Sequence, residues 1–203
     1  MEQTVVIKPK MNFTPSREGK KYFVKTFGCQ MNEHDSEKIA GMFELDGMTK
    51  ATLEDSADIM FINTCTIREN ADDRLYGTLG QLKKWKDEGI DRKLLVGGCA
   101  AQKDKELVRE RAPWVDVVIG THNLTNIINL LNQSEDWGPI TEIIDEIEDL
   151  PTDAPSIRES EHSAWLTIQI GCNNSCTFCI VPSVRGPEIS RRPSDIINEA
   201  QEL

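Results

Sequence analysis

The stretch DIMFINTC, Asp58–Cys65, combines a short strand-like apolar run with a cysteine directly behind it. Two other stretches repeat this arrangement, YFVKTFGC at 22–29 and KLLVGGC at 93–99. Short apolar runs bounded by turn residues are typical of buried strands in a parallel sheet. We therefore expect strands at Tyr22–Phe27, Asp58–Asn63, Lys93–Val96 and, further on, Val115–Ile119.

Segments with helical spacing separate these expected strands. Asn32, with Asp35 three residues later, predicts the start of the first helix, and Thr66 with Glu69 forms a capping-box pattern for the second. The apolar stripe of the second helix consists of Ile67, Ala71, Leu75, Leu79, Leu82 and Trp85. Two more helices are expected, at Lys103–Arg111 and around Leu124–Leu131. Strands that alternate with helices predict an α/β fold with a doubly wound parallel sheet.

The composition is that of a folded, soluble chain. Of the 203 residues, 38% are hydrophobic and 28% are charged, which argues against a disordered chain. No apolar run approaches the roughly 18 residues that a membrane span needs, and the first residues, MEQTVVIKPK, lack the apolar core of a secretory signal. We therefore expect a cytoplasmic protein without a membrane partner. Six cysteines in such a protein indicate metal binding or catalysis before disulfides.

The net charge of −11 is concentrated in one segment. Residues 135–161 contain ten acidic residues and a single basic one, so the rest of the chain is nearly neutral. The charge therefore neither requires nor excludes a nucleic-acid partner. With Gly138, Pro151 and Pro155, the segment is typical of a solvated linker between domains.

This linker divides the chain into four predicted parts. They are an N-terminal extension (1–21), the α/β domain (22–134), the acidic linker (135–162) and a last unit (163–203). In the last unit we expect a strand at Trp165–Ile170 and a helix that opens at Pro193. About 40 residues are too few for an independent α/β domain, so we expect the chain to be a fragment of a longer protein.

A first set of cysteines follows the expected strands. Cys29, Cys65 and Cys99 each lie one to three residues beyond a strand, and the carboxyl ends of parallel strands meet at one edge of a sheet. Three thiols from three loops can bind one metal cluster and leave one coordination position free. Free cysteines are also common in protein cores, and the spacing alone leaves both interpretations open.

A second set has the spacing C-x3-C-x2-C, at Cys172, Cys176 and Cys179. Three thiolates on a short loop after a strand can ligate three irons of a 4Fe–4S cluster and leave the fourth iron open. Zinc and disulfides are the alternatives. Zinc normally takes a fourth Cys or His ligand, but His34, His122 and His162 lie at no zinc-finger spacing and are interpreted as surface or capping residues.

The second cysteine loop resembles that of radical S-adenosylmethionine enzymes, including an aromatic residue, Phe178, before the last cysteine. The resemblance implies that the open iron chelates S-adenosylmethionine, which is cleaved reductively to a 5′-deoxyadenosyl radical, and that Phe178 lies near the adenine. It also implies that residues 163–203 begin a partial TIM-type barrel, which the chain does not complete.

Three N-terminal segments, TFGCQMNEHDSE (26–37), NTCTIRENADDRLYGTLG (63–80) and GGCAAQ (97–102), resemble the methylthiotransferase family of these enzymes. The family resemblance implies that Cys29, Cys65 and Cys99 hold a second, auxiliary 4Fe–4S cluster. It also implies two roles for S-adenosylmethionine, as methyl donor and as radical source. The barrel remainder and the RNA-binding domain are missing, so we expect this chain alone to be inactive.

The segment GCQMN at 28–32 is most similar to the tRNA-directed branch of the family. This implies addition of a methylthio group to carbon 2 of an isopentenyl-modified adenosine next to the anticodon. The implied partners are a tRNA anticodon stem-loop and a reducing electron donor, and we expect a monomer. Alternatives are a threonylcarbamoyl-adenosine tRNA or a ribosomal protein as substrate, or an iron–sulfur electron-transfer or scaffold module. Arg185, Arg191 and Arg192 are interpreted either as contacts to phosphate or the S-adenosylmethionine carboxylate, or as a solvated segment.

Overall fold

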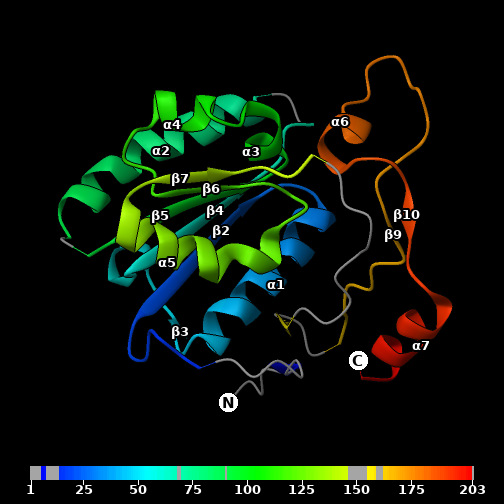
Figure 1. The fold of residues 1–203 in the computed structure, drawn as a ribbon, viewed down its shortest axis with the longest axis horizontal. Coiled ribbons are helices and arrows are strands. Elements are labelled where there is room, and N and C mark those ends of the chain that lie inside the picture. The colour runs from blue at the N-terminus through cyan, green and yellow to red at the C-terminus, as the bar shows by residue number, and fades with distance from the viewer. Residues whose placement is uncertain are drawn as a thin grey trace.

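The computed structural model describes residues 6–7, 14–67, 70–89, 91–145, 155–158 and 162–202. Its centre is a six-stranded parallel sheet with the strand order β3-β2-β4-β5-β6-β7 (Figure 1). In that order the strands are β3 (Thr49–Lys50), β2 (Lys21–Phe27), β4 (Ile59–Thr64), β5 (Lys93–Gly98), β6 (Val117–Ile119) and β7 (Ile140–Glu142). The predicted α/β fold with a doubly wound parallel sheet is therefore confirmed.

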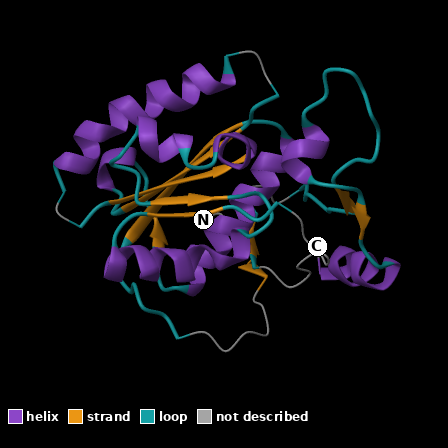
Figure 2. Ribbon diagram, turned by 45° about the horizontal axis from the view of Figure 1, so that its top comes forward, coloured by secondary structure: helices purple, strands orange, loops and turns teal. Residues whose placement is uncertain are grey.

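Helices cover both faces of the sheet (Figures 1 and 2). One face carries α1 (Gln30–Leu45) and α5 (Ile127–Trp137), and the other carries α2 (Ala71–Asp87), α3 (Cys99–Asp104) and α4 (Leu107–Arg111). Each face has its own apolar core, to which Phe61 and Met60 of β4 contribute on opposite sides. All six residues of β4 are buried, which explains why its sequence is apolar without alternation.

The winding of the sheet reverses between β2 and β4. From β2 the chain moves outward to β3 at one edge, and then returns to place β4 on the other side of β2. Open parallel sheets bind ligands at the carboxyl ends of the strands, at such a reversal. The loops that follow β2 and β4 are the loops that contain Cys29 and Cys65.

The predicted starts of the first two helices are wrong. α1 begins at Gln30, directly behind Cys29, because the Cys29 carbonyl already accepts the N–H groups of Asn32 and Glu33. Asn32 therefore lies inside the helix and does not cap it. α2 begins at Ala71 rather than near Thr66, and Asn70 before it has a left-handed backbone (φ 61°).

The predicted stripe of α2 is confirmed from Leu75 to Trp85, whereas Ile67 lies outside the helix and is exposed. Glu69, the second half of the predicted capping box, lies outside the described residues. The predicted helix Lys103–Arg111 is split into α3 and α4, because Lys105 adopts a positive φ of 52°. Local spacing located the helices but not their ends.

The segment predicted as an acidic linker begins inside the sheet domain. Residues 135–137 complete α5, and β7 adds the last strand to the sheet, parallel to β6. Glu142 is accommodated there because its carboxylate accepts hydrogen bonds from the side chains of Asn123 (2.7 Å) and Asn126 (2.8 Å). Residues 146–154 and 159–161 of the predicted linker lie outside the described residues.

The remaining elements are short. They are β1 (Val6–Ile7), paired with β8 (Ser156–Ile157), two 3-10 turns (Glu54–Ser56 and Leu124–Asn126), α6 (Val181–Arg185), α7 (Pro193–Glu202), and β9 (Gln169–Ile170), paired antiparallel with β10 (Ile189–Ser190). The predicted helix at Pro193 is confirmed. Of the predicted strand Trp165–Ile170, only the last two residues are paired. α6, β9, β10 and α7 lie beside the sheet domain, with α6 nearest to it (Figure 1).

Candidate metal centre

Three cysteines lie at the carboxyl ends of three neighbouring strands. Phe27, Thr64 and Gly98, the last residues of β2, β4 and β5, stand side by side in register. Cys29 follows two residues after its strand, and Cys65 and Cys99 follow directly. All three cysteines therefore lie at the same edge of the sheet, as the strand pattern predicts.

The local backbone explains how Cys99 reaches this edge. Gly98 has a φ of +90°, which favours glycine, and lets β5 turn directly into α3. A Cβ atom at Gly98 would overlap the side-chain oxygen of Asn63 and lie 2.6 Å from the carbonyl oxygen of Thr64. Only glycine therefore allows β5 to pass this close to β4, with Cys99 as the first residue of the next helix.

Two fully buried amides hold α1 against the end of β4. Asn32 Nδ2 donates to Asn63 Oδ1 at 2.8 Å, and Asn63 Nδ2 donates to the Asn32 carbonyl (2.8 Å) and to Ser36 Oγ (2.9 Å). Asn32 Oδ1 accepts a hydrogen bond from the Cys29 thiol at 3.4 Å. Sequence reasoning missed the role of Asn63; the available signal was a polar residue in an apolar strand, two residues before a cysteine.

N–H groups point at two of the three sulfur atoms. The backbone N–H of Ile67 donates to Cys65 Sγ at 3.3 Å, and Arg185 Nε donates to Cys99 Sγ at 3.3 Å. Burial raises the pKa of the Cys99 thiol, and the charge and hydrogen bond of Arg185 oppose that increase. Donors of this kind stabilise thiolate sulfur, which is the form that binds metals.

The second cysteine set lies on a loop at the surface. Cys176 and Cys179 are exposed, Cys172 is half-buried, and Phe178 is 96% exposed. The Cys179 N–H donates to the Cys176 carbonyl at 3.1 Å, which makes a turn between these two residues. Phe178 therefore faces solvent, next to Cys179 of the second cysteine set.

Arg185 connects the region of the second set to the first. Its side chain is 3% exposed, and its Nη2 atom lies 2.7 Å from Asp35 Oδ2 on α1. Burial alone would lower the pKa of Arg185, but Asp35 and Cys99 together raise it above its usual range, so the guanidinium stays charged. A solvated Arg185 is therefore excluded. Arg191 is ion-paired with Glu199, and Arg192 is exposed.

Each cysteine set supplies three thiols, a donor type that can bind three irons of a 4Fe–4S cluster or, with a fourth ligand, a zinc ion. In the described ranges, no three His, Cys, Asp or Glu side chains are grouped so that they could hold one metal ion. In a 4Fe–4S cluster each cysteine binds a different iron, so the sulfur atoms stay farther apart than the ligands of one zinc ion. The prediction that the histidines are surface residues is wrong for His34 and His122, which are both buried.

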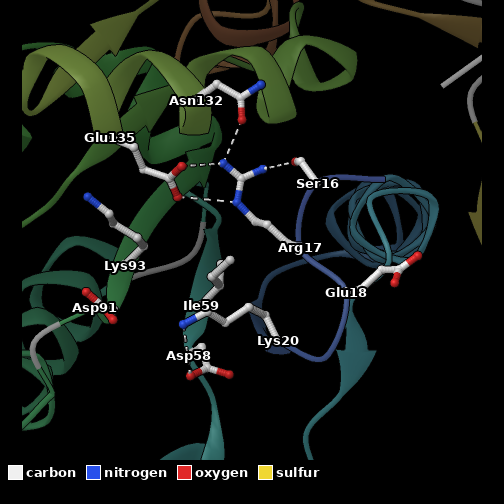
Figure 3. A pocket seen from close by; sticks show the side chains of 10 residues that line it. All are labelled: Ser16, Arg17, Glu18, Lys20, Asp58, Ile59, Asp91, Lys93, Asn132 and Glu135. Atoms are coloured by element: carbon white, nitrogen blue, oxygen red, sulfur yellow. Dashed lines mark hydrogen bonds and ion pairs between the residues drawn. The ribbon is translucent and has the colours of Figure 1, made fainter. Parts of the chain in front are cut away.

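A cavity of about 540 Å³ lies at the opposite, amino-terminal edge of the sheet (Figure 3). Asp58 and Lys93 at the starts of β4 and β5 line it, together with Arg17 and Glu135. The buried guanidinium of Arg17 binds Asp46, Asn132 and Glu135. This cavity contains no cysteine, and the candidate metal centre is therefore not part of it.

Comparisons with known proteins identify one matching family and several similar sequences. Residues 21–120 match the model described as "Uncharacterized protein family UPF0004". The chain is 51% identical over 192 residues to a tRNA-2-methylthio-N(6)-dimethylallyladenosine synthase of Corynebacterium efficiens, which aligns with 93% of this chain and 37% of that protein. Proteins with the same name in Tropheryma whipplei and Mycobacterium bovis are 54% and 50% identical, each over 90% of this chain and over 39% and 36% of their own lengths.

The chain thus spans well under half the length of these curated relatives. Among the described residues, the helices are all too short or too polar to cross a membrane. Cys29, Cys65 and Cys99 and five of the six strands of the parallel sheet fall within the matched range: residues 21–120 of this chain are a UPF0004 domain.

Proposed function

We propose that this chain is part of a tRNA methylthiotransferase that adds a methylthio group to carbon 2 of an isopentenyl-modified adenosine next to the anticodon. The observation that carries the proposal is the placement of Cys29, Cys65 and Cys99 at adjoining strand ends, with Arg185, which follows the second cysteine set, bound to Cys99. About 50% identity to relatives that are named for this reaction supports it.

In this proposal the first set binds an auxiliary 4Fe–4S cluster. Cys29, Cys65 and Cys99 provide three thiolates, and the Ile67 N–H and the Arg185 guanidinium offset their negative charge. The Asn32–Asn63 pair keeps the first turn of α1, and with it Cys29, fixed relative to β4. One coordination position stays free of protein ligands.

The second set, Cys172, Cys176 and Cys179, binds the other 4Fe–4S cluster in this proposal, and residues 163–203 begin the radical domain. The two clusters and S-adenosylmethionine supply the electron, the radical and the methylthio sulfur when they are bound. Phe178 is proposed to lie against the adenine of S-adenosylmethionine. Its exposure suits that role, because an aromatic ring that faces solvent is free to stack on a bound base.

The substrate named for the relatives is a tRNA, and an anticodon loop presents its bases without the cost of opening a duplex. Such a reaction also needs a reducing electron donor. The cytoplasmic location and the monomeric state that were predicted from the sequence agree with this function and stay predictions.

The proposal is tested by deleting the gene that encodes this chain and measuring 2-methylthio-modified adenosines in tRNA by mass spectrometry. We expect the methylthio group to disappear from isopentenyl-adenosine. The wild-type gene and the control Leu53→Ala, at a position 68% exposed and far from any cysteine in sequence, should restore it. Cys29→Ala and Cys172→Ala should not.

Three results would overturn the proposal. Unchanged methylthio-isopentenyl-adenosine, in a strain with no second enzyme for this modification, would exclude the reaction. Loss of the methylthio group from threonylcarbamoyl-adenosine, and not from isopentenyl-adenosine, would show that threonylcarbamoyl-adenosine tRNA is the substrate. Full restoration by both cysteine variants would show that the reaction requires neither cluster, which would exclude the proposed radical mechanism.

A further inference from the structure

Arg185 lies between the two cysteine sets. It ends α6, six residues after Cys179, and is the only charged residue in the segment 171–187. Its Nε donates to Cys99 Sγ at 3.3 Å, and its Nη2 lies 2.7 Å from Asp35 Oδ2. One buried guanidinium therefore binds a side chain of α1 and a side chain of α3 at the same time.

The backbone beside Arg185 holds the base of the second cysteine loop. The Cys172 N–H donates to the Gly186 carbonyl at 3.2 Å. Gly171 has a φ of +77°, and a Cβ atom there would lie 2.6 Å from the Gly186 oxygen and overlap the Pro187 oxygen. The two sides of the loop base are thus in close contact. Two hydrogen bonds, the peptide unit between Arg185 and Gly186 and the Arg185 side chain therefore join Cys172 to Cys99.

Two neutral contacts accompany the arginine. Thr121 Oγ1 donates to the Val184 carbonyl at 2.7 Å, and the His122 ring lies 3.2 Å from the position of a Cβ atom on Gly186. These contacts attach α6 to the loop that follows β6. They supply no charge at Cys99, so only Arg185 combines attachment with an effect on a thiol.

We propose that Arg185 is a positioning residue that holds the second cysteine loop against the carboxyl edge of the sheet and offsets the negative charge of the Cys99 thiolate. The planar guanidinium presents Nε and Nη2 at a fixed spacing, which a lysine ammonium cannot reproduce. Removal of the guanidinium would also leave Asp35 buried without its partner. The effect on the thiolate rests on the proposed function, because it concerns a cluster held by Cys99; the attachment does not.

Attachment is tested on the metal-free chain by hydrogen exchange. In Arg185→Gln we expect amides at 171–187 to exchange about tenfold faster or more, because the loop separates from the sheet. Arg185→Lys should give an intermediate rate. Arg17→Gln is the matched control, since Arg17 is also buried and paired with a buried aspartate, but at the opposite edge of the sheet. It should leave exchange at 171–187 unchanged.

The effect on the thiolate is tested by an EPR-monitored redox titration in a Cys172→Ala/Cys176→Ala/Cys179→Ala background, where only the first set can bind a cluster. A nearby cation and an N–H···S hydrogen bond raise the reduction potential of a cluster. We therefore expect Arg185→Gln to shift the potential to more negative values, Arg185→Lys to shift it less, and Arg17→Gln not to shift it.

Hydrogen exchange and the redox titration test the two halves of the proposal separately. Unchanged exchange at 171–187 in Arg185→Gln would overturn the attachment, whether or not iron binds. An unchanged potential in a chain that does bind iron would overturn the effect on the thiolate. No iron uptake by the first set in the wild-type chain would overturn the proposed function together with the thiolate half, while the exchange experiment would still decide the attachment.

Discussion

At the scale of single residues, His34 shows what burial does to a charged group in this fold. Its pKa is lowered from 6.5 to about 4, mainly by burial and next by the positive charge of Lys38. Asp35 opposes this decrease, whereas Arg158 and Arg191 add to it. The imidazole is therefore neutral in the folded chain at pH 7, and it stays neutral well into the acid range.

We predict that His34 makes the chain less stable in acid. Between pH 6.5 and 4 the unfolded chain binds a proton that the folded chain does not, so stability that is present above pH 6.5 is lost as the pH falls towards 4. The loss is at most about 3 kcal/mol for this residue. His34→Gln should flatten the dependence of the free energy of unfolding on pH, as measured by urea unfolding from pH 7.5 to 4.5.

Burial also lowers the pKa of His122, so His34→Gln should reduce the slope and the double variant with His122→Gln should reduce it further. Parallel curves for wild type and His34→Gln over this range would show that His34 does not titrate as described.

The six thiols could be identified as candidate metal ligands from the sequence, because cysteines just after expected strands and in C-x3-C-x2-C spacing form a distinctive pattern. Their supporting residues could not. The contact between Asn32 and Asn63 spans 31 residues, and the contact between Arg185 and Cys99 spans 86. Such pairs depend on how the sheet brings distant segments together, which no local spacing reports.

At the scale of elements, the central strands were predictable and the element ends were not. β4 is buried on both faces, so its apolar run is unambiguous, whereas β7 is an edge strand whose acidic Glu142 resembles linker sequence. Amide donors from Asn123 and Asn126 make that carboxylate acceptable at the edge. The start of α2 was misplaced for a related reason. The capping pattern at Thr66 is local, but the backbone N–H of Ile67 donates to the Cys65 sulfur, and α2 begins only at Ala71.

The packing of α2 on the sheet provides a test of this core. Leu79, in the middle of α2, is 1% exposed, so Leu79→Ala should lower the free energy of unfolding by about 2–5 kcal/mol through lost burial and a cavity. Helix propensity does not oppose this, since alanine is itself a good helix former. Chemical denaturation measures the change.

Leu53→Ala is the control for the same deletion of atoms, because Leu53 is 68% exposed. Its effect should stay within about 0.5 kcal/mol. Equal losses for the two variants would mean that α2 does not pack on the sheet as described.

At the scale of the whole molecule, the two edges of the sheet have different roles. The amino-terminal edge contains the Arg17–Asp46 ion pair, which ties residues 16–17 to the end of α1 and, through Glu135, to α5. The carboxyl-terminal edge collects three thiols, the buried amides and Arg185. The buried ion pair and the three thiols of the candidate metal centre thus lie at opposite edges of the sheet, and the C-terminal segment attaches to the edge with the thiols (Figure 1).

In the proposed function, each cysteine set binds its own 4Fe–4S cluster. The most direct measurement is the iron and sulfide content of the chain after anaerobic reconstitution, for wild type and for each triple cysteine-to-alanine variant. We predict roughly eight irons per chain for wild type and roughly four for either variant. Zinc without iron, or a wild-type iron content in Cys29→Ala/Cys65→Ala/Cys99→Ala, would contradict the claim.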